Sequence, residues 1–219
     1  GFKLTPDWRA SIGARHFDYK ADQLMYSIDQ FSPFGRDANG FARTTPEPLE
    51  YGHGSVHNDG EVYRFNTSYS LPRGLVYLTV AEGFRPGGFN FENAFVQLDP
   101  QQRQYDPDTL VSYEVGGKFS FLDNRVYLSS ALFYIDWSDI QTDVYSEQAG
   151  FTVLGNAGKA KSQGFEIEVD SKDIFVDGLS ILATYSFTDV KLRETVPFLG
   201  YAGQRAPAVP RHTGSLMLD

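Results

Sequence analysis

The segment from Leu110 to Ile140 alternates apolar and polar residues in two arms, and this alternation limits the possible folds more than any other feature. The first arm has apolar side chains at odd positions, namely Val111, Tyr113, Val115, Phe119 and Phe121. It has polar or small residues at even positions, namely Ser112, Glu114, Gly116, Lys118 and Ser120. Because successive side chains of a strand point to opposite faces, this pattern predicts a strand with one apolar and one polar face.

A short turn joins the two arms. The residues 122–125 carry Asp123 and Asn124 at their centre, which favours a tight turn. Each arm has at least 12 residues, whereas an average strand of a soluble protein has about 5–6. A membrane-spanning β-strand needs about 9–11 residues. The segment is therefore typical of a transmembrane β-hairpin.

The rest of the chain extends this pattern into an expected all-β meander of about eight antiparallel strands. Beside the hairpin, alternation predicts strands at 8–19, 61–70, 75–84, 161–171, 178–190 and 211–218. Long connections at 21–60, 85–108, 147–155 and 196–210 alternate with short turns near Pro72, Asn124 and Asp173. Outer-membrane barrels have this layout, whereas a Greek-key sandwich has no reason to keep it. We expect the apolar faces, containing Val115, Phe119, Ile167 and Ile181, to meet lipid.

Composition removes several other classes of protein. Among 219 residues there is no Cys, so no disulfide, thiol or Cys-ligated metal site is expected. The net charge of -9 argues against nucleic acid as a partner. No apolar run approaches the roughly 18 residues of a transmembrane helix. The first residues have no apolar core of a signal peptide, so we interpret the chain as a mature or internal piece.

Three groups of residues are candidates for chemistry. His53 and His57 are spaced as helical metal ligands are, but the neighbouring glycines favour an ordinary polar loop. The acidic residues of 166–170 alternate on one strand, which favours charges that line a lumen over acid–base catalysis. Arg85 could pair with an anionic ligand or only bond loop carbonyls, and we favour the structural role. G-x-S-x-G, H-E-x-x-H and P-loop motifs are absent from the sequence.

Three segments together resemble the TonB-dependent outer-membrane receptors. They are YLTVAEGFRPGGFN at 77–90, LVSYEVGGKFSFLDNRVYLSSALFYIDWSDIQ at 110–141, and NAGKAKSQGFEIEV at 156–169. Their order and spacing agree with the later half of that family's barrel. The resemblance implies a plugged barrel of about 22 strands. Residues 1–219 would form a partial barrel domain of about eight strands, without the plug, the TonB box or the closing strands.

The resemblance also implies a function. Receptors of this family sit in the bacterial outer membrane and import scarce ligands, commonly ferric siderophores, energised by the TonB complex acting through the plug. The expected partners are thus membrane lipid, the TonB complex and a ferric siderophore, with no cofactor and no enzymatic activity. The expected ligand contacts in the extracellular loops are Phe34, Tyr51, Phe84, Arg85 and Tyr105. A passive pore and a soluble β-sandwich that binds a ligand remain as alternatives.

Overall fold

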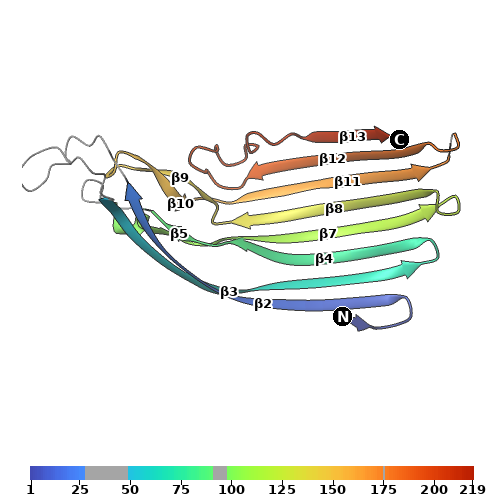
Figure 1. Ribbon diagram of the computed structural model, residues 1–219, viewed down its shortest axis with the longest axis horizontal. Coiled ribbons are helices and arrows are strands. Elements are labelled where there is room, and N and C mark those ends of the chain that lie inside the picture. The colour runs from blue at the N-terminus through green and yellow to red at the C-terminus, as the bar shows by residue number, and fades with distance from the viewer. Residues whose placement is uncertain (28–48, 91–97, 175) are drawn as a thin grey trace, which may run out of the picture.

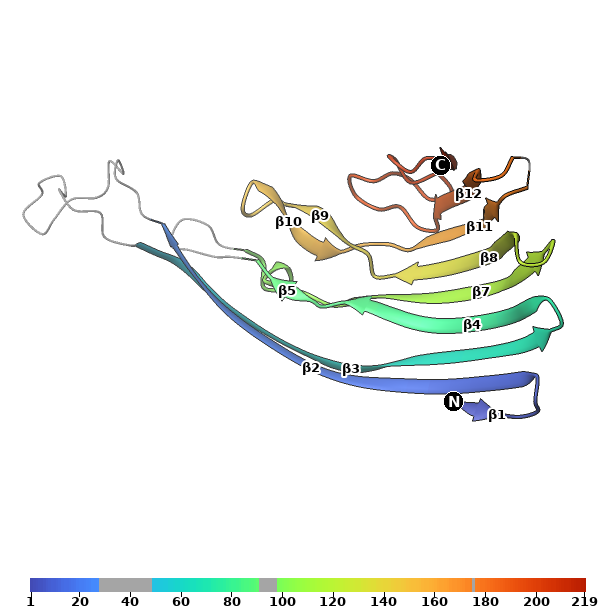
Figure 2. The ribbon, with the colours of Figure 1, turned by 45° about the vertical axis from the view of Figure 1, so that its right-hand side comes forward.

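The chain forms one large antiparallel sheet in the computed structural model, which describes residues 1–27, 49–90, 98–174 and 176–219. For residues 23–27 and 49–53 it describes the backbone alone. The nine strands are adjacent in chain order, without a crossover, and the sheet is strongly curved (Figures 1 and 2). They are β1 (Phe2–Lys3), β2 (Trp8–Ser27), β3 (Leu49–Leu71), β4 (Gly74–Arg85), β7 (Asp108–Phe121), β8 (Val126–Ser138), β11 (Ala160–Lys172), β12 (Ser180–Leu192) and β13 (His212–Leu218).

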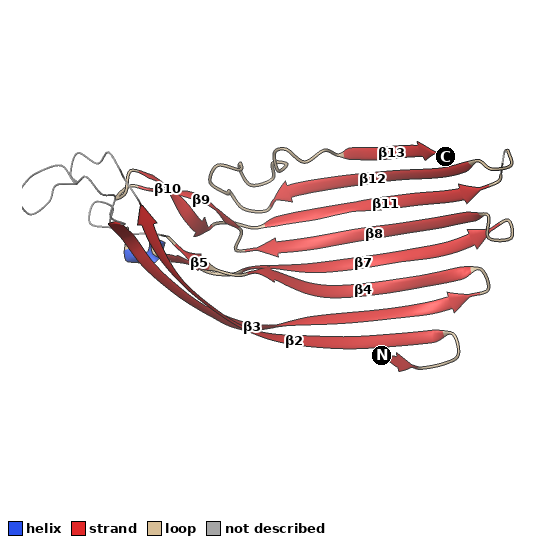
Figure 3. Ribbon diagram, viewed as in Figure 1, coloured by secondary structure: helices blue, strands red, loops and turns tan. Residues whose placement is uncertain are grey.

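The expected meander of eight long strands is therefore confirmed, with β1 as a short addition. Figure 3 shows that most of the described chain is strand. β4, β7, β8, β11 and β12 have 12 to 14 residues each, which is enough to cross a bilayer. Within the described residues no helix is long and apolar enough to span a membrane.

The register separates an apolar from a polar face across the whole sheet. Val115 lies opposite Leu132, which lies opposite Phe165, so these apolar side chains share one face. The same parity puts Val115, Phe119, Ile167 and Ile181 together on this face, as the sequence predicts. Ile12 is 73% exposed there and Leu132 is 60% exposed. No second sheet packs over this face among the described residues, which rules out the sandwich.

Tight turns close the strands at one end of the sheet, as expected near Pro72, Asn124 and Asp173. In the turn between β7 and β8, Leu122, Asp123 and Asn124 all have positive φ, at 50°, 56° and 65°. Asp and Asn tolerate this left-handed conformation better than most residues. The long connections all leave the opposite end, which identifies it as the extracellular end of an outer-membrane barrel.

The expected loop at 21–60 is wrong in part, because β2 and β3 run far beyond the other strands (Figure 1). Their pairing continues from Trp8–Tyr69 up to Ser27–Leu49, with one irregularity between Met25 and Tyr26. Backbone hydrogen bonds hold this extension. Above the lipid both faces are wet, so the sequence needs no apolar–polar alternation there, and period-two analysis misses it.

Other boundaries also differ from the sequence prediction. The connection 85–108 contains β5 (Gly88–Phe89), the 3-10 helix η1 (Pro100–Gln102) and β6 (Gln104–Tyr105). The connection at 147–155 belongs to a hairpin of β9 (Gln141–Ser146) and β10 (Phe151–Asn156). Beside this hairpin, the small core of Ile140, Ala160, Leu192 and Val196 packs under the connection from β12 to β13. These short elements give the extracellular rim a defined structure.

Candidate functional site

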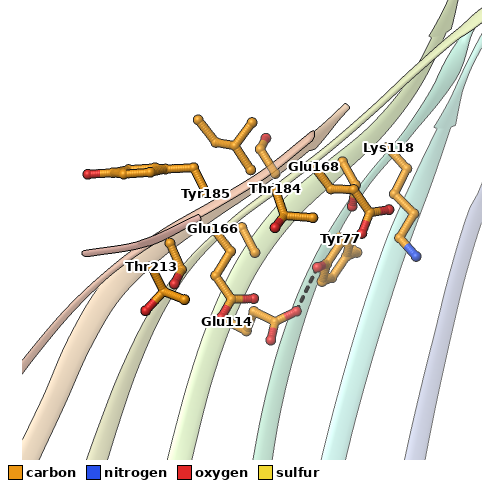
Figure 4. Close-up of a pocket in the computed structure, with 13 residues that line it drawn as sticks. Tyr77, Glu114, Lys118, Glu166, Glu168, Thr184, Tyr185 and Thr213 are labelled. Atoms are coloured by element: carbon orange, nitrogen blue, oxygen red, sulfur yellow. Dashed lines mark hydrogen bonds between the residues drawn. The ribbon is translucent and has the colours of Figure 1, made fainter. Parts of the chain in front are cut away.

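The polar face of the sheet carries a groove of about 420 Å³ across β4, β7, β8, β11 and β12 (Figure 4). Three of its four charged residues are acidic: Glu114 comes from β7, and Glu166 and Glu168 come from β11. Lys118 is the basic residue that lines the same groove. The register places the acidic residues of β11 on the lumen face, as the sequence predicts.

Tyr77 fixes one of these carboxylates. Its hydroxyl donates a hydrogen bond of 2.6 Å to Oε1 of Glu114. The phenol ring lies over Gly116, its partner across the β4–β7 pair, where a Cβ atom would be 2.6 Å from the ring. Gly116 is therefore the residue that lets Tyr77 reach Glu114. Glu166 and Glu168 accept no hydrogen bond from the described residues, so the groove presents anionic oxygen to whatever occupies the lumen.

A second cluster lies at the extracellular ends of β4 and β7. Asp108 is 2% exposed and accepts hydrogen bonds from Nε of Arg85 at 2.8 Å and from Nε1 of Trp137 at 3.1 Å. The Arg85 guanidinium also lies 5.2 Å from the centroid of the Trp137 ring, in a cation–π contact. The charge of Arg85 is thus paired with Asp108 rather than bonded to the carbonyls of 87–88, and its part in ligand binding stays a prediction.

Burial and hydrogen bonding act on Asp108 in opposite directions. Asp108 and Arg85 lie at the strand ends, above the roughly 9–11 residues of each strand that cross the bilayer. Burial on its own raises the pKa of Asp108, but hydrogen bonds from Arg85 and Gln141 outweigh it, so the pKa lies below its ordinary value. Asp108 is therefore ionised at neutral pH and holds Arg85 in place.

Three side-chain amides join the connection 86–107 to the β9–β10 hairpin, and we call Asn90, Gln141 and Asn156 the amide clamp. Nε2 of Gln141 donates to the carbonyls of Pro86 and Asp106, at 2.9 and 3.0 Å. Nδ2 of Asn156 donates to the Asp106 carbonyl at 2.8 Å, and its Oδ1 accepts from the Asp106 amide at 2.7 Å.

Asn90 completes the clamp at the far side of the hairpin. Its Nδ2 donates to the carbonyls of Gln102 and Leu154, at 2.8 and 2.7 Å, and its Oδ1 accepts from the Leu154 amide at 3.1 Å. Sequence analysis missed the clamp as a functional unit. The available signal is that Asn90, Gln141 and Asn156 each end or begin one of the three motifs quoted above.

The expected ligand contacts are scattered over the rim. Phe84 stacks on Phe17, with ring centroids 3.7 Å apart. Tyr105 covers Gly88, where a Cβ atom would be 2.2 Å from the phenol oxygen. Tyr51 lies in β3, but its side chain is outside the described residues, as is the whole of Phe34. Among the side chains that the structure describes, Phe84, Arg85 and Tyr105 thus have different contacts, and their role in ligand binding stays a prediction.

Of the histidine pair of the sequence, the structure describes only the side chain of His57. Nε2 of His57 lies 2.9 Å from Oδ1 of Asp18 across the β2–β3 pair. The side chain of His53 is outside the described residues. Where side chains are described, no three His, Asp or Glu residues converge as metal ligands do.

Comparison with known proteins identifies the architecture. The family model "TonB dependent receptor-like, beta-barrel" matches residues 1–219. A probable TonB-dependent siderophore receptor of Acinetobacter baumannii is 22% identical over 98% of this chain and 27% of its own length. The pesticin receptor of Yersinia enterocolitica is 30% identical over 74% of this chain and 23% of its own. The chain spans about a quarter of the length of these curated relatives.

A solved structure agrees in fold. The ferric yersiniabactin uptake receptor of Yersinia pestis superposes with a TM-score of 0.71 at 23% identity, over 98% of this chain and 29% of that one. The sheet, its extracellular rim and its acidic lumen face are therefore parts of an outer-membrane barrel. The chain belongs to the TonB-dependent receptor family, of whose β-barrel domain it forms a part.

Proposed function

We propose that this chain is part of a receptor that captures a ferric siderophore at its extracellular rim and imports it with energy from the TonB complex. The observation that carries the proposal is the amide clamp. Asn90, Gln141 and Asn156 hold two loops together through hydrogen bonds of 2.7 to 3.1 Å to backbone groups. Loops that are fixed on a rigid scaffold form a preorganised binding surface, which lowers the entropic cost of capture.

The rim also exposes aromatic side chains that suit a bulky chelate. Tyr145 and Phe151 of the β9–β10 hairpin are 56% and 45% exposed. Phe198 and Tyr201, in the connection from β12 to β13, are 66% and 69% exposed. Aromatic faces bind the flat or apolar parts of a ligand. We add these four residues to the predicted ligand contacts Phe34 and Tyr51, and we assign Arg85 to the support of the rim.

The acidic groove suggests what fills the lumen during TonB-driven import. Glu114, Glu166 and Glu168 need cations, and Lys118 supplies one positive charge. We assign the missing cations to basic side chains of a plug domain inside the lumen, on which the TonB complex acts. The same polar face also suits the water-filled lumen of a passive pore, which is the second candidate function.

Growth of a receptor-deleted strain on single iron chelates, with and without a functional TonB complex, tests the proposal. The full-length receptor should restore growth on at least one ferric siderophore only when TonB is active. Growth that persists without TonB would favour the passive pore. Uptake of a glycan or cobalamin but of no iron chelate would overturn the iron assignment.

The clamp is tested in the same strain. Asn90→Ala with Asn156→Ala should weaken binding of the transported chelate to whole cells about tenfold or more, since several hydrogen bonds of about 1 kcal/mol each are lost. The matched control is Asn124→Gly, at the opposite end of the barrel, because Gly accepts the φ of 65° there. Equal binding by all three receptors would show that the clamp plays no part in capture.

A further inference from the structure

Three basic residues lie side by side on the apolar face of the sheet, at the extracellular ends of its strands. Lys161 of β11 pairs with Lys191 of β12, and Lys191 forms an isolated bridge with Arg205. Residues that are directly opposite on adjacent strands project from the same face, with Cβ atoms about 5 Å apart, and like charges in such pairs are destabilising. We call Lys161, Lys191 and Arg205 the cation row. It needs an anion.

The nearby carboxylates are too few to supply it. Asp189 is the nearest, and it lies 3.4 Å from Lys191 Nζ, 3.3 Å from Arg205 Nε and 3.2 Å from Arg211 Nη2. One carboxylate therefore faces three cations. With a side-chain exposure of 9%, Asp189 sits beneath them and leaves their outer side open.

The carboxylate on the other side of the row is already occupied. Asp136 lies opposite Lys161 in the β8–β11 pair, but both its oxygens accept hydrogen bonds from Nη1 of Arg193, at 2.8 and 2.7 Å. Lys161 has no ion pair with any residue whose side chain is described. In a chain of net charge -9, five cations here share Asp189 and Asp136, and the next carboxylate, Glu194, lies 3.4 Å from Nζ of Lys159.

The height of the row is that of lipid head groups. Lys161 lies near the extracellular end of β11, 11 positions from Lys172 at the other end. At about 3.3 Å per residue and a tilt of about 40°, this distance spans roughly 28 Å along the membrane normal. The apolar band of an outer-membrane barrel is about 25 Å tall. The cation row thus stands just above the hydrocarbon.

The surface directly below the row is apolar. Phe165 and Phe187, opposite each other on β11 and β12, share its face and lie four positions closer to the membrane centre. Leu132 of β8 is beside Phe165 and is 60% exposed. An anion that carries acyl chains would bind both surfaces, whereas free phosphate would use only the cations.

We propose that the cation row binds the phosphate head group of an outer-leaflet lipid, whose acyl chains lie along Phe165, Phe187 and Leu132. The site lies on the lipid-facing side of the sheet, away from the lumen groove and the amide clamp, so it holds whether or not the receptor transports iron. Bound lipid would neutralise the repulsion between Lys161 and Lys191 and tie the extracellular ends of β11 and β12 to the membrane.

Native mass spectrometry of the full-length receptor in neutral detergent tests this proposal. The probes are dioleoyl phosphatidic acid, dioleoyl phosphatidylcholine and inorganic phosphate. The receptor should retain phosphatidic acid in preference to the other two. Lys161→Gln should weaken its binding about fivefold, and the Lys161→Gln, Lys191→Gln double variant about 25-fold, because each basic residue near a membrane surface contributes about 1 kcal/mol.

Lys118→Gln is the matched control, since it removes the same charge from the lumen face. It should bind phosphatidic acid as the unchanged receptor does. Equal retention of phosphatidic acid and phosphatidylcholine, or binding of inorganic phosphate as tight as that of the lipid, would overturn the proposal. So would a lower unfolding temperature of Lys161→Gln in lipid-free neutral detergent, because that loss would reveal a carboxylate of the longer protein as the true partner.

Discussion

Asp108 is the residue on which the rim structure near Trp137 depends. It is 2% exposed and receives hydrogen bonds from Arg85, Trp137 and Gln141. Asp108→Asn keeps the shape but removes the charge that pairs with Arg85. Because the Arg85 side chain is 53% exposed, solvent screens the pair, and we expect a local destabilisation of about 1–2 kcal/mol. The destabilisation should appear as faster proteolysis or amide exchange at 104–110 in the full-length variant than in the parent. Slower proteolysis or exchange in the variant would contradict the prediction.

The pH dependence of the same variant follows from the lowered pKa of Asp108. A carboxyl group with a depressed folded-state pKa contributes stability above its unfolded pKa of about 3.9, and this stability is lost as pH falls through the folded value. The difference in rim protection between parent and Asp108→Asn should therefore be constant from about pH 5 to 8. It should shrink below about pH 4. Amide exchange measured at both ends of this range, corrected for intrinsic rates, checks the sign.

At the scale of elements, β2 and β3 extend well beyond the span of the membrane. Their paired backbones continue above His16–Glu61 to Ser27–Leu49, and 21–27 and 49–60 lie where the sequence predicts a loop. Paired amides exchange only through local opening. In the full-length receptor we expect the amides of 17–22 and 55–60 to exchange at least about tenfold more slowly than an unstructured peptide of the same sequence. Unprotected exchange in both segments, beside protected amides in β7 and β8, would show that this hairpin does not form.

At the scale of the molecule, the sequence predicts best the strands that cross the membrane. Lipid on one side and water on the other require strict alternation, so 110–121 and 161–171 are recognisable as strands from the residues alone. Above the membrane this requirement ends, and such a pattern is missing from the extensions of β2 and β3, at 21–27 and 49–60, and from β9 and β10. The amide clamp is hidden for a related reason: Asn90 and Asn156 are 66 positions apart, and only the closure of the rim brings them to one hairpin.

The final prediction concerns residues 1–219 as an isolated chain. In the described structure the sheet is open, with β1 and β2 at one edge and β13 at the other, and these edges do not pair. Each unpaired backbone group in hydrocarbon costs several kcal/mol, so a curved sheet with two bare edges is not stable in a bilayer. Expressed alone, this chain should aggregate or stay outside the membrane, while the full-length receptor, as control, should fold into a heat-modifiable barrel. A monomer of the isolated chain that refolds cooperatively in detergent and resists heat would show that these strands can close on themselves.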